Sequence, residues 1–592
     1  MNFKRINFIE RIITWFHERI NEKQFLIFAS IMVGITAGIA AVVLKLFVFA
    51  IRHYLVDGYL IQFDYKYLYL LLPLIGIGLT VLVVKYFFKN NLNSGNTNIL
   101  FSIAKKGSYL PFHQMYSQVF TSALTVGFGG SAGLESPIVS TGAAIGSNFG
   151  STYKLNYKDR TLLLAAGAAG GIAGAFNAPI AGVLFALEVI LVDISISAFI
   201  PLLIAAASGA LLSKIILHES SLLFFKLKQP FDYNNVFLYI VLGLLAGVTS
   251  LYYVNFFDKV ETRFSKIKSG FAKWLIGGIS LAFLFALFPS LFGEGYESIK
   301  ALSEFRPEDL FKDSIVLGLI SNKWILLIFI ALTLLLKSVA AAITLGSGGN
   351  GGNFAPSLFV GAYLGFVFSL FLILIGFDAI PVSNFTIVAM AGILSGVFHA
   401  PLTAIFLIAE ITGGYELIIP LMIVSSISYV IVKRFHPESL DVKRLKARGA
   451  VISEDKDTSI LSKINTQEMI ETDFAPIHFK ATLRDIVETI KHSKRNTFPV
   501  VKLNNKLLGI IYLDNIREEM FNPELYDIVT AKELMRKAPT VINSSEDIFS
   551  IMKKFEESGH WNLPVVEEGI YLGFLSKSSI LDKYRQELLE AL

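Results

Sequence analysis

The sequence of 592 residues contains no cysteine. This absence excludes disulfide bonds, thiolate metal sites and catalysis by a cysteine nucleophile. Charged side chains are also scarce: they make up 17% of the residues, whereas 54% of the residues are hydrophobic. A chain of this composition is not an ordinary soluble protein.

Catalytic signatures are missing as well. The sequence has no HExxH, no GxSxG and no paired aspartate motif. Among the histidines, only His399 falls well inside an apolar segment, and the internal repeat described below aligns it with Asn177. This alignment indicates a helix-breaking or polar packing position. We therefore expect neither an enzyme nor a metal site, with an intramembrane enzyme as a remote alternative.

Long apolar segments dominate the first three quarters of the chain. About 20 apolar residues suffice for a helix to cross a bilayer. Examples of such segments are Phe25–Val48, Tyr69–Val84, Val236–Tyr253, Trp274–Phe292 and Ile325–Leu336. We predict an α-helical polytopic membrane domain over residues 25–434. The net charge of +5 is spread over loops, which is typical of membrane orientation and not of nucleic-acid binding.

The N-terminal residues 1–24 are charged and amphipathic and show no cleavable signal pattern. We predict that they form a helix lying on the cytoplasmic membrane surface.

Two stretches 222 residues apart share nearly the same pattern. Gly174–Glu188 reads GAFNAPIAGVLFALE and Gly396–Glu410 reads GVFHAPLTAIFLIAE. Upstream, Gly133–Pro137 and Gly352–Pro356 share a Gly-x-x-x-Pro pattern at an offset of 219. The membrane domain is thus predicted to be duplicated, with halves of about 25–216 and 234–434. Glycine- and proline-interrupted apolar segments in both halves indicate a transport site between them.

Each upstream stretch follows a glycine-rich polar loop, GFGGSAG at 127–133 and GSGGNGG at 346–352. Non-helical backbone at membrane depth is tolerated only where it lines a cavity or is buried in protein. Because Pro137 and Pro356 suit the first turn of a helix, each loop is expected to deliver a helix N-terminus into the membrane interior. The unpaired N–H groups and the positive dipole end of such a terminus bind anions. Close packing of small residues alone does not explain matched polar loops in both halves.

The composition changes sharply after Val432. We predict a basic linker over residues 435–460 and a soluble α/β tail over 461–592. The tail is itself duplicated, in copies of about 466–523 and 530–589. Each copy combines a helix with two strands joined by a hairpin turn, and FPVV at 498–501 and LPVV at 563–566 mark equivalent strands.

The pieces GLESP, AFNAPIAGVLFALE, GGNFAPS and ITGGYELIIPLMIV resemble the CLC family of chloride channels and chloride/proton antiporters, and the tail resembles the paired CBS domains of many members. The resemblance implies two inverted halves around an anion pathway, and a homodimer in the lipid bilayer. We expect a bacterial inner membrane or plasma membrane location with cytoplasmic N- and C-termini. Chloride is the expected cargo and protons are a second candidate, and neither a required cofactor nor a nucleic-acid partner is expected.

By resemblance, Glu135 is the gating glutamate. A carboxylate and a chloride ion compete for the same N–H groups, so ionised Glu135 can close the site and its protonation can open it. The resemblance also places four residues at the chloride site: Ser94, Gly133, Asn353 and Phe354. Ser94 would offer its hydroxyl, and Asn353 and Phe354 their backbone N–H groups. Ser94 lies in the stretch NSGNT, which matches only part of the family's GSGIP loop.

The sequence also departs from the family pattern. Val189 stands where antiporters commonly carry an inner glutamate, so the usual proton relay is lost there. The neighbouring Glu188 is matched by Glu410 of the other half, which indicates a structural role. Asp441 stands at the position of the family's site tyrosine; because an ionised aspartate would repel chloride, it either points elsewhere or leaves the site open on its inner side. Tyr429 is a candidate replacement whose spacing argues against it.

Paired CBS domains often bind adenine nucleotides through a glycine, a Ser/Thr and an Asp/Asn. The corresponding residues are Gly509, Tyr512 and Asn515 in the first copy and Gly573, Ser576 and Ser579 in the second. Each copy departs at one polar position, which leaves Asn515 and Ser576 as candidate nucleotide contacts. A structural or dimerising role is the preferred interpretation of the tail.

These departures favour chloride transport that is channel-like or only weakly coupled to protons, with a chloride/proton antiporter as the alternative. A fluoride-type relative is a remote alternative, because the family's fluoride branch typically lacks the serine found here as Ser94. A CBS-regulated cation transporter is another, but it would need a cage of intramembrane carboxylates.

Overall fold

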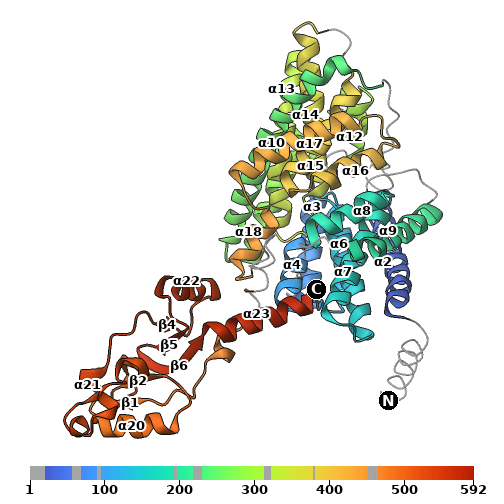
Figure 1. The fold of residues 1–592 in the computed structure, drawn as a ribbon. Helices are drawn as coiled ribbons and strands as arrows, with labels where there is room; N and C mark the ends of the chain where they lie inside the picture. The colour runs from blue at the N-terminus through green and yellow to red at the C-terminus, as the bar shows by residue number, and fades with distance from the viewer. Residues whose placement is uncertain are drawn as a thin grey trace. The chain divides into compact units, whose positions relative to one another are not determined.

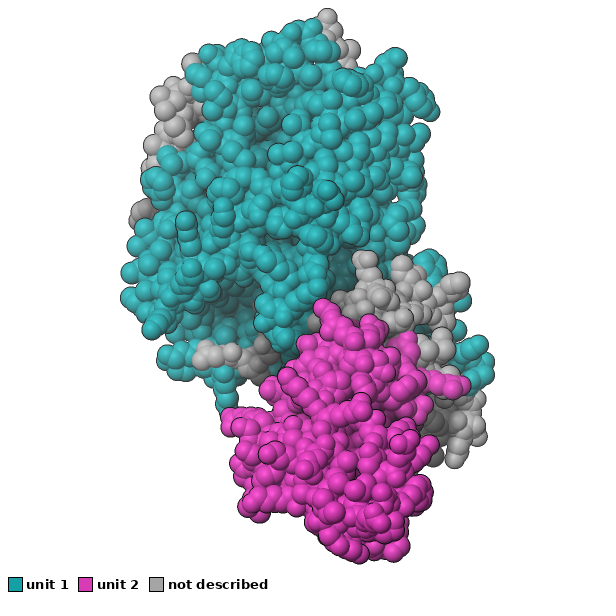
Figure 2. Space-filling view, turned by 60° about the vertical axis from the view of Figure 1, so that its left-hand side comes forward, with its two compact units in different colours: residues 1–452 teal, residues 453–592 magenta. Residues whose placement is uncertain are grey.

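The computed structural model describes residues 21–55, 68–89, 92, 95–191, 196–217, 230–311, 322–377, 380–450, 461 and 464–591. Most of the predicted N-terminal helix, and Ser94, lie outside the described residues. The chain divides into two compact units, Met1–Ile452 and Ser453–Leu592, which Figure 2 colours separately.

The described residues of the first unit form helices joined by loops. Its first half contains α2 (Glu22–Arg52), η2 (Leu68–Leu71), α3 (Leu72–Tyr86), α4 (Asn96–Lys105), α5 (Gln114–Gly127), α6 (Glu135–Thr152), α7 (Tyr157–Phe176), α8 (Pro179–Phe185), the π-helix η3 (Ala186–Ile190) and α9 (Ile196–Leu217). Its second half contains η4 (Tyr233–Asn235), α10 (Val236–Ser265), α11 (Gly270–Leu287), η5 (Pro289–Leu291), α12 (Tyr296–Ser303), η6 (Pro307–Leu310), α13 (Lys323–Gly346), α14 (Phe354–Leu374), α15 (Val382–Phe398), α16 (Pro401–Ile411), α17 (Ile418–Phe435) and α18 (Leu440–Ala447). The two halves lie side by side in Figure 1, the first blue to green and the second green to orange.

Eight helical segments among the described residues are long and apolar enough to cross a membrane. Four of the five apolar segments singled out in the sequence fall within such helices, whereas the fifth, Trp274–Phe292, runs past the end of its helix at Leu287. Three further apolar helices are shorter: Pro179–Ile190, Val382–Phe398 and Pro401–Ile411. The polytopic helical prediction is confirmed.

Small residues let the helices of each half approach at backbone distance. A Cβ atom at Gly142 of α6 would lie 2.1 Å from the carbonyl oxygen of Gly167 in α7. At the equivalent position of the second half, a Cβ atom at Gly361 of α14 would lie 2.7 Å from the carbonyl oxygen of Ala389 in α15. Since lipid supplies no hydrophobic force between helices, such close packing is what holds membrane helices together.

The second unit contains the two predicted helix-and-hairpin copies. The first has β1 (Ile477–His478), α20 (Leu483–His492), β2 (Thr497–Val501) and β3 (Leu507–Tyr512), and the second has β4 (Ile542–Asn543), α22 (Ile548–Ser558), β5 (Asn562–Glu567) and β6 (Ile570–Ser576). The short element η8 (Thr466–Met469) precedes β1, and four more lie between β3 and β4: η9 (Leu513–Asn515), η10 (Glu519–Phe521), η11 (Pro523–Leu525) and α21 (Ala531–Leu534). The helix α23 (Lys577–Ala591) follows β6. In each copy the first strand pairs in parallel with the second, which pairs antiparallel with the third. The mixed α/β tail is confirmed.

The beginning of the predicted linker is folded. Residues 440–447 form α18 and belong to the first unit. Leu445 of α18 is buried in a cluster with Leu100 of α4, and Lys443 forms an ion pair of 2.9 Å with Asp258 of α10. Two of the basic residues that indicated a linker, Lys443 and Arg444, therefore form ion pairs with α10.

Candidate ion-binding site

The two glycine-rich loops meet at the interface between the halves. Gly133 and Gly352 exchange backbone hydrogen bonds of 2.8 Å in both directions, in an isolated antiparallel bridge. Two threonine hydroxyls beside the bridge form a second reciprocal pair of hydrogen bonds between the halves. Thr125 accepts from the N–H of Asn350 at 2.9 Å, and Thr344 accepts from the N–H of Ser131 at 3.1 Å. These reciprocal contacts relate the two halves by an inverted, approximately twofold arrangement.

Three helix N-termini converge beside this bridge. The helices α6 and α14 begin two residues after Gly133 and Gly352, at Glu135 and Phe354. Ser136 lies between Gly352, where a Cβ atom would be 2.7 Å from Ser136 Cβ, and Gly95, where a Cβ atom would be 3.9 Å from Ser136 Oγ. Since Gly95 caps α4 with a φ of 89°, the first turn of α4 reaches the same point. The N-termini of three helices thus lie close together inside the first unit, and the glycine-rich loops predicted two of them, those of α6 and α14.

Glu135 lies at this junction and is only 3% exposed. Its Oε1 atom accepts a hydrogen bond from the Tyr296 hydroxyl of α12. Its Oε2 atom is buried without a hydrogen-bond partner among the described residues. Gly133 adjoins both Oε2 and the backbone nitrogen of Ala355, since a Cβ atom there would lie 2.1 Å and 3.0 Å from them. The carboxylate therefore lies beside the N-terminus of α14, where it occupies space that an anion would need.

The loop before Tyr296 is fixed on two sides. The Nζ atom of Lys337, which is fully buried in α13, donates to the carbonyl oxygens of Gly293 at 2.8 Å and Leu291 at 3.2 Å. The N–H of Gly293 donates to the carbonyl oxygen of Gly129 in the first glycine-rich loop. Lys337 thereby positions Tyr296. Sequence analysis missed both residues, although a lone lysine in the apolar segment of α13 is a recognisable signal.

Asn353 and Phe354 stand at the start of α14 as expected. The Tyr253 hydroxyl of α10 donates to the Asn353 carbonyl oxygen at 3.2 Å. The Phe354 ring, 3% exposed, packs against the rings of Phe176 and Phe398, which close equivalent helices of the two halves. The backbone of both residues is held in place, which leaves their roles in chloride binding as a prediction.

Glu188 and Glu410 cap each other's repeat. The Glu188 carboxylate accepts from the N–H groups of Leu402 at 3.0 Å and Thr403 at 2.7 Å, at the start of α16. The Glu410 carboxylate accepts from Ile180 at 3.0 Å and Ala181 at 2.8 Å, at the start of α8. This exchange supports the structural interpretation of Glu188.

Three other residues singled out in the sequence, Val189, Asp441 and Tyr429, each have contacts of their own. Val189 lies in η3 and packs against the apolar core. The Asp441 carboxylate is turned to the first turn of α4 and accepts from Thr97 and Asn96. The Tyr429 hydroxyl accepts from Lys433 at 2.7 Å, and its ring packs edge-on against His399. Tyr429 thus contacts residues of α17 and the end of α15, and neither contact involves α4. His399 itself ends α15 in a left-handed conformation, as Asn177 ends α7, which confirms a helix-breaking position.

Comparison with known proteins decides the family. The family model for the voltage gated chloride channel matches residues 76–433, and the CBS domain model matches residues 467–522 and 531–586. This chain belongs to the CLC family. A ClcB-like chloride channel protein of Ralstonia nicotianae is 30% identical over 371 residues, which cover 61% of this chain and 81% of that protein.

Solved CLC structures share the fold. A slow cyanobacterial Cl−/H+ antiporter superposes with a TM-score of 0.62 at 23% identity and covers 72% of this chain and 98% of its own. A eukaryotic CLC transporter superposes with a TM-score of 0.59 at 18% identity and covers 94% of this chain and 97% of its own. The CLC helical fold with a paired CBS tail is therefore established for this protein.

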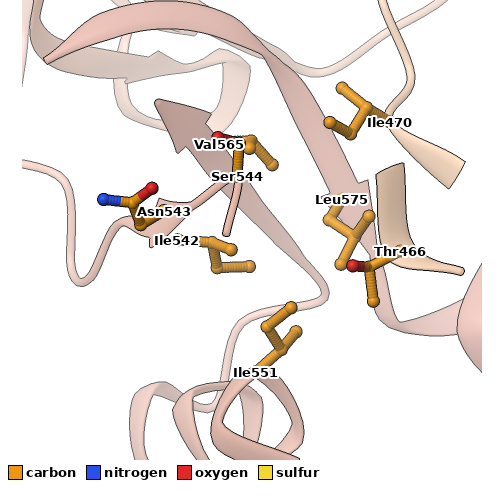
Figure 3. Close-up of a pocket in the computed structure, with 8 residues that line it drawn as sticks. All are labelled: Thr466, Ile470, Ile542, Asn543, Ser544, Ile551, Val565 and Leu575. Carbon is orange, nitrogen blue, oxygen red and sulfur yellow. The ribbon is translucent and has the colours of Figure 1, made fainter. Parts of the chain in front are cut away.

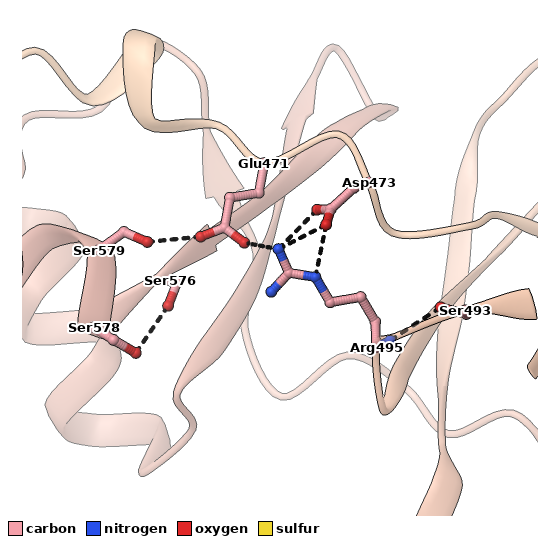
Figure 4. Close-up of polar contacts among 7 residues, drawn as sticks. All are labelled: Glu471, Asp473, Ser493, Arg495, Ser576, Ser578 and Ser579. Atoms are coloured by element: carbon pink, nitrogen blue, oxygen red, sulfur yellow. Dashed lines mark hydrogen bonds and ion pairs between the residues drawn. The ribbon is translucent and has the colours of Figure 1, made fainter.

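In the second CBS copy, the candidate nucleotide-contacting serines already form hydrogen bonds with other side chains of the protein. Figure 4 shows Glu471 between Ser579 and Arg495: the Ser579 hydroxyl donates to Glu471 Oε1 at 2.7 Å, and Arg495 pairs with Glu471 at 2.5 Å and with Asp473 at 2.8 Å. Ser576 shares a hydrogen bond of 3.1 Å with Ser578. The Ser579 hydroxyl, which the sequence analysis aligned with a nucleotide contact, thus already donates to a carboxylate.

The first copy is no better suited. Tyr512 stacks on His560 at 5.6 Å between ring centroids, and its hydroxyl is buried without a hydrogen-bond partner among the described residues. Burial raises the pKa of Tyr512. Asn515 is half-buried at the end of η9. These features do not assemble a polar ribose site.

A pocket in the second copy is small. It lies between η8, α22 and the sheet and measures about 190 Å³, open solvent included. Figure 3 shows the eight lining residues: Thr466, Ile470, Ile542, Asn543, Ser544, Ile551, Val565 and Leu575. None of these eight side chains is charged. The pocket offers little to a nucleotide's phosphates.

Proposed function

We propose that this protein conducts chloride across the membrane, with Glu135 as the gate. The observation that carries the proposal is the convergence of three helix N-termini at a buried carboxylate that one tyrosine hydroxyl holds. N–H groups and the positive ends of helix dipoles attract an anion. Ionised Glu135 competes with chloride for this place, and its protonation removes the competing charge.

The same geometry argues against a cation carrier. Cation sites are built from several oxygen ligands, whereas the converging elements here present backbone N–H groups. Among the described residues no cluster of three or more acidic or histidine side chains is suited to a metal ion. Names of relatives also favour an anion, since the Ralstonia relative is named a chloride channel protein and the cyanobacterial neighbour a Cl−/H+ antiporter.

We further propose a channel-like or weakly proton-coupled conductor. Val189 packs against the core where an inner proton-carrying glutamate would be needed, and Glu188 is committed to capping α16. A chloride/proton antiporter is the alternative, because Glu135 can exchange protons with the outer solution in either mechanism. The protein is proposed to act as a homodimer with both termini in the cytoplasm.

The proposal is tested by chloride efflux from proteoliposomes. Efflux through the wild-type protein should rise as the external pH falls, because protonation neutralises Glu135. Glu135→Gln should give fast efflux at every external pH. Glu297→Gln changes an exposed acid that follows Tyr296 in the first turn of α12 and pairs with Arg52, and it should behave as wild type. Unchanged external pH dependence in Glu135→Gln would remove Glu135 from the gate.

A further inference from the structure

A second acidic residue lies beside Glu135 at the start of α6. Glu294 belongs to the loop between η5 and α12, outside the apolar helices Gly270–Leu287 and Lys323–Gly346 that flank it in the sequence. Its side chain is partly buried, and its carboxyl group faces the N–H of Leu134. Leu134 is the residue directly before α6, so Glu294 reaches the same helix start as the gate.

Both carboxyl groups adjoin one peptide unit. Glu135 Oε2 lies against Gly133, where a Cβ atom would be 2.1 Å from it. The Glu294 carboxyl group faces the N–H of the next residue, Leu134. The Cα atom of Gly133 and the nitrogen of Leu134 belong to the same planar peptide. The two carboxyl groups are therefore neighbours, and their charges interact.

The loop that carries Glu294 is anchored on both sides of this residue. Before it, Gly293 donates its N–H to the carbonyl oxygen of Gly129 and accepts from Lys337 Nζ at 2.8 Å. After it, the Tyr296 hydroxyl donates to Glu135 Oε1. These contacts hold the backbone of Glu294 next to the gate.

The charged and titratable groups around Glu294 come from four helices: Glu135 of α6, Tyr296 of α12, Lys45 and Arg52 of α2, and Lys337 of α13. Burial raises the pKa of the Glu294 carboxyl, and the negative charge of Glu135 raises it further, against the opposing effect of the two cations on α2. Glu294 therefore keeps its proton to a higher pH than an ordinary glutamate does.

A protonated Glu294 supplies a donor that the closed gate lacks. Glu135 Oε2 is buried and has no hydrogen-bond partner among the described residues, and a buried acceptor without a donor is unfavourable. An ionised carboxylate can only accept hydrogen bonds, whereas a protonated carboxyl group donates through its O–H. Glu294 can thus stabilise ionised Glu135 while it holds a proton, and it can only repel Glu135 once that proton is lost.

We propose that Glu294 is the proton-bearing partner of the gate. In the closed site Glu135 is ionised, Tyr296 donates to its Oε1 atom, and protonated Glu294 donates to its Oε2 atom. The two glutamates then share one proton and one negative charge. At alkaline pH the Glu294 proton passes to the solution, and two like charges at one helix start destabilise the closed site. This role rests on the proposed function of Glu135 as the chloride gate.

The test is chloride efflux from proteoliposomes that contain the full-length protein, with the same pH on both sides, varied from acid to alkaline. Wild-type efflux should pass through a minimum. It should rise on the acid side because Glu135 is protonated, and on the alkaline side because Glu294 is ionised, each time by at most about tenfold per pH unit.

Two substitutions of Glu294 separate its donor from its charge. Glu294→Gln keeps an amide donor that does not titrate, so this variant should lose the alkaline rise and keep the acid rise. Glu294→Leu removes the donor as well. It should raise efflux at the wild-type minimum by about tenfold or more, and it should also lack the alkaline rise. The acid rise that both variants keep shows that they are folded.

Matched variants distinguish the possible failures. Glu297→Gln changes a nearby exposed acid and should keep both the acid and the alkaline rise. Glu135→Gln should give fast efflux over the whole pH range. If wild type carries no chloride, or if Glu135→Gln keeps a pH dependence, the proposed function fails. If Glu135→Gln is independent of pH but wild type lacks the alkaline rise, or Glu294→Gln retains it, only the role of Glu294 is overturned.

Discussion

Tyr296→Phe is the sharpest test of how Glu135 is held. The Tyr296 hydroxyl donates to Glu135 Oε1, and Oε2 has no hydrogen-bond partner among the described residues. The variant removes this hydrogen bond with little change in volume. A hydrogen bond to a charged group contributes about 1.5–3 kcal/mol, so the ratio of closed to open sites should fall by about 10- to 150-fold. Chloride efflux at neutral external pH should rise, up to the limit set by an open pathway.

The assay is chloride efflux from proteoliposomes, measured as a double-mutant cycle with Glu135→Gln. Because Gln already mimics the open state, Tyr296→Phe should change efflux by less than about twofold in that background. Tyr252→Phe is the matched control, since it removes another tyrosine hydroxyl bond, to Leu335, on the exposed side of α10. An equal effect of Tyr296→Phe in both backgrounds would refute the idea that Tyr296 acts through Glu135.

Three further predictions follow from the contacts. Glu188→Gln and Glu410→Gln should each lower the stability of the purified protein by about 1 kcal/mol, and the two variants should have the same effect on transport. Loss of proton movement in Glu188→Gln alone would contradict a purely structural role. Lys337→Met should release the loop before Tyr296, which should raise chloride efflux and lower the stability by about 1–3 kcal/mol. Lys337→Arg should restore wild-type efflux and stability. If Lys337→Met changes neither, Lys337 does not position the loop. Titration calorimetry of the full-length protein with ATP, ADP and AMP should show no binding, because Glu471 already holds Ser579 and Arg495; saturable heat would overturn this.

The repeat made part of the site predictable from sequence. An offset of 222 residues aligned Glu188 with Glu410, and each indeed caps the helix start of the other half. The offset of 219 aligned Gly133 with Gly352, which pair directly. Duplicated sequence predicts equivalent positions, and an inverted arrangement then brings equivalent positions together.

Contacts outside the repeat could not be predicted in this way. Tyr296 reaches Glu135 from 161 residues away, through a loop whose path depends on Lys337. Nothing in the local pattern fixes that path. The same holds for Asp441, whose partners Asn96 and Thr97 depart from the family pattern in another segment. Helix α18 was missed because its surface is basic, although Leu445 anchors it.

The reversal potential under opposed chloride and pH gradients tests the central claim most directly. For a chloride conductor gated by Glu135 and lacking a proton carrier at Val189, the reversal potential should follow the chloride gradient and be unaffected by the pH gradient. A reversal potential that shifts with the pH gradient in a fixed proportion, or uphill proton movement driven by chloride, would contradict the account and establish antiport.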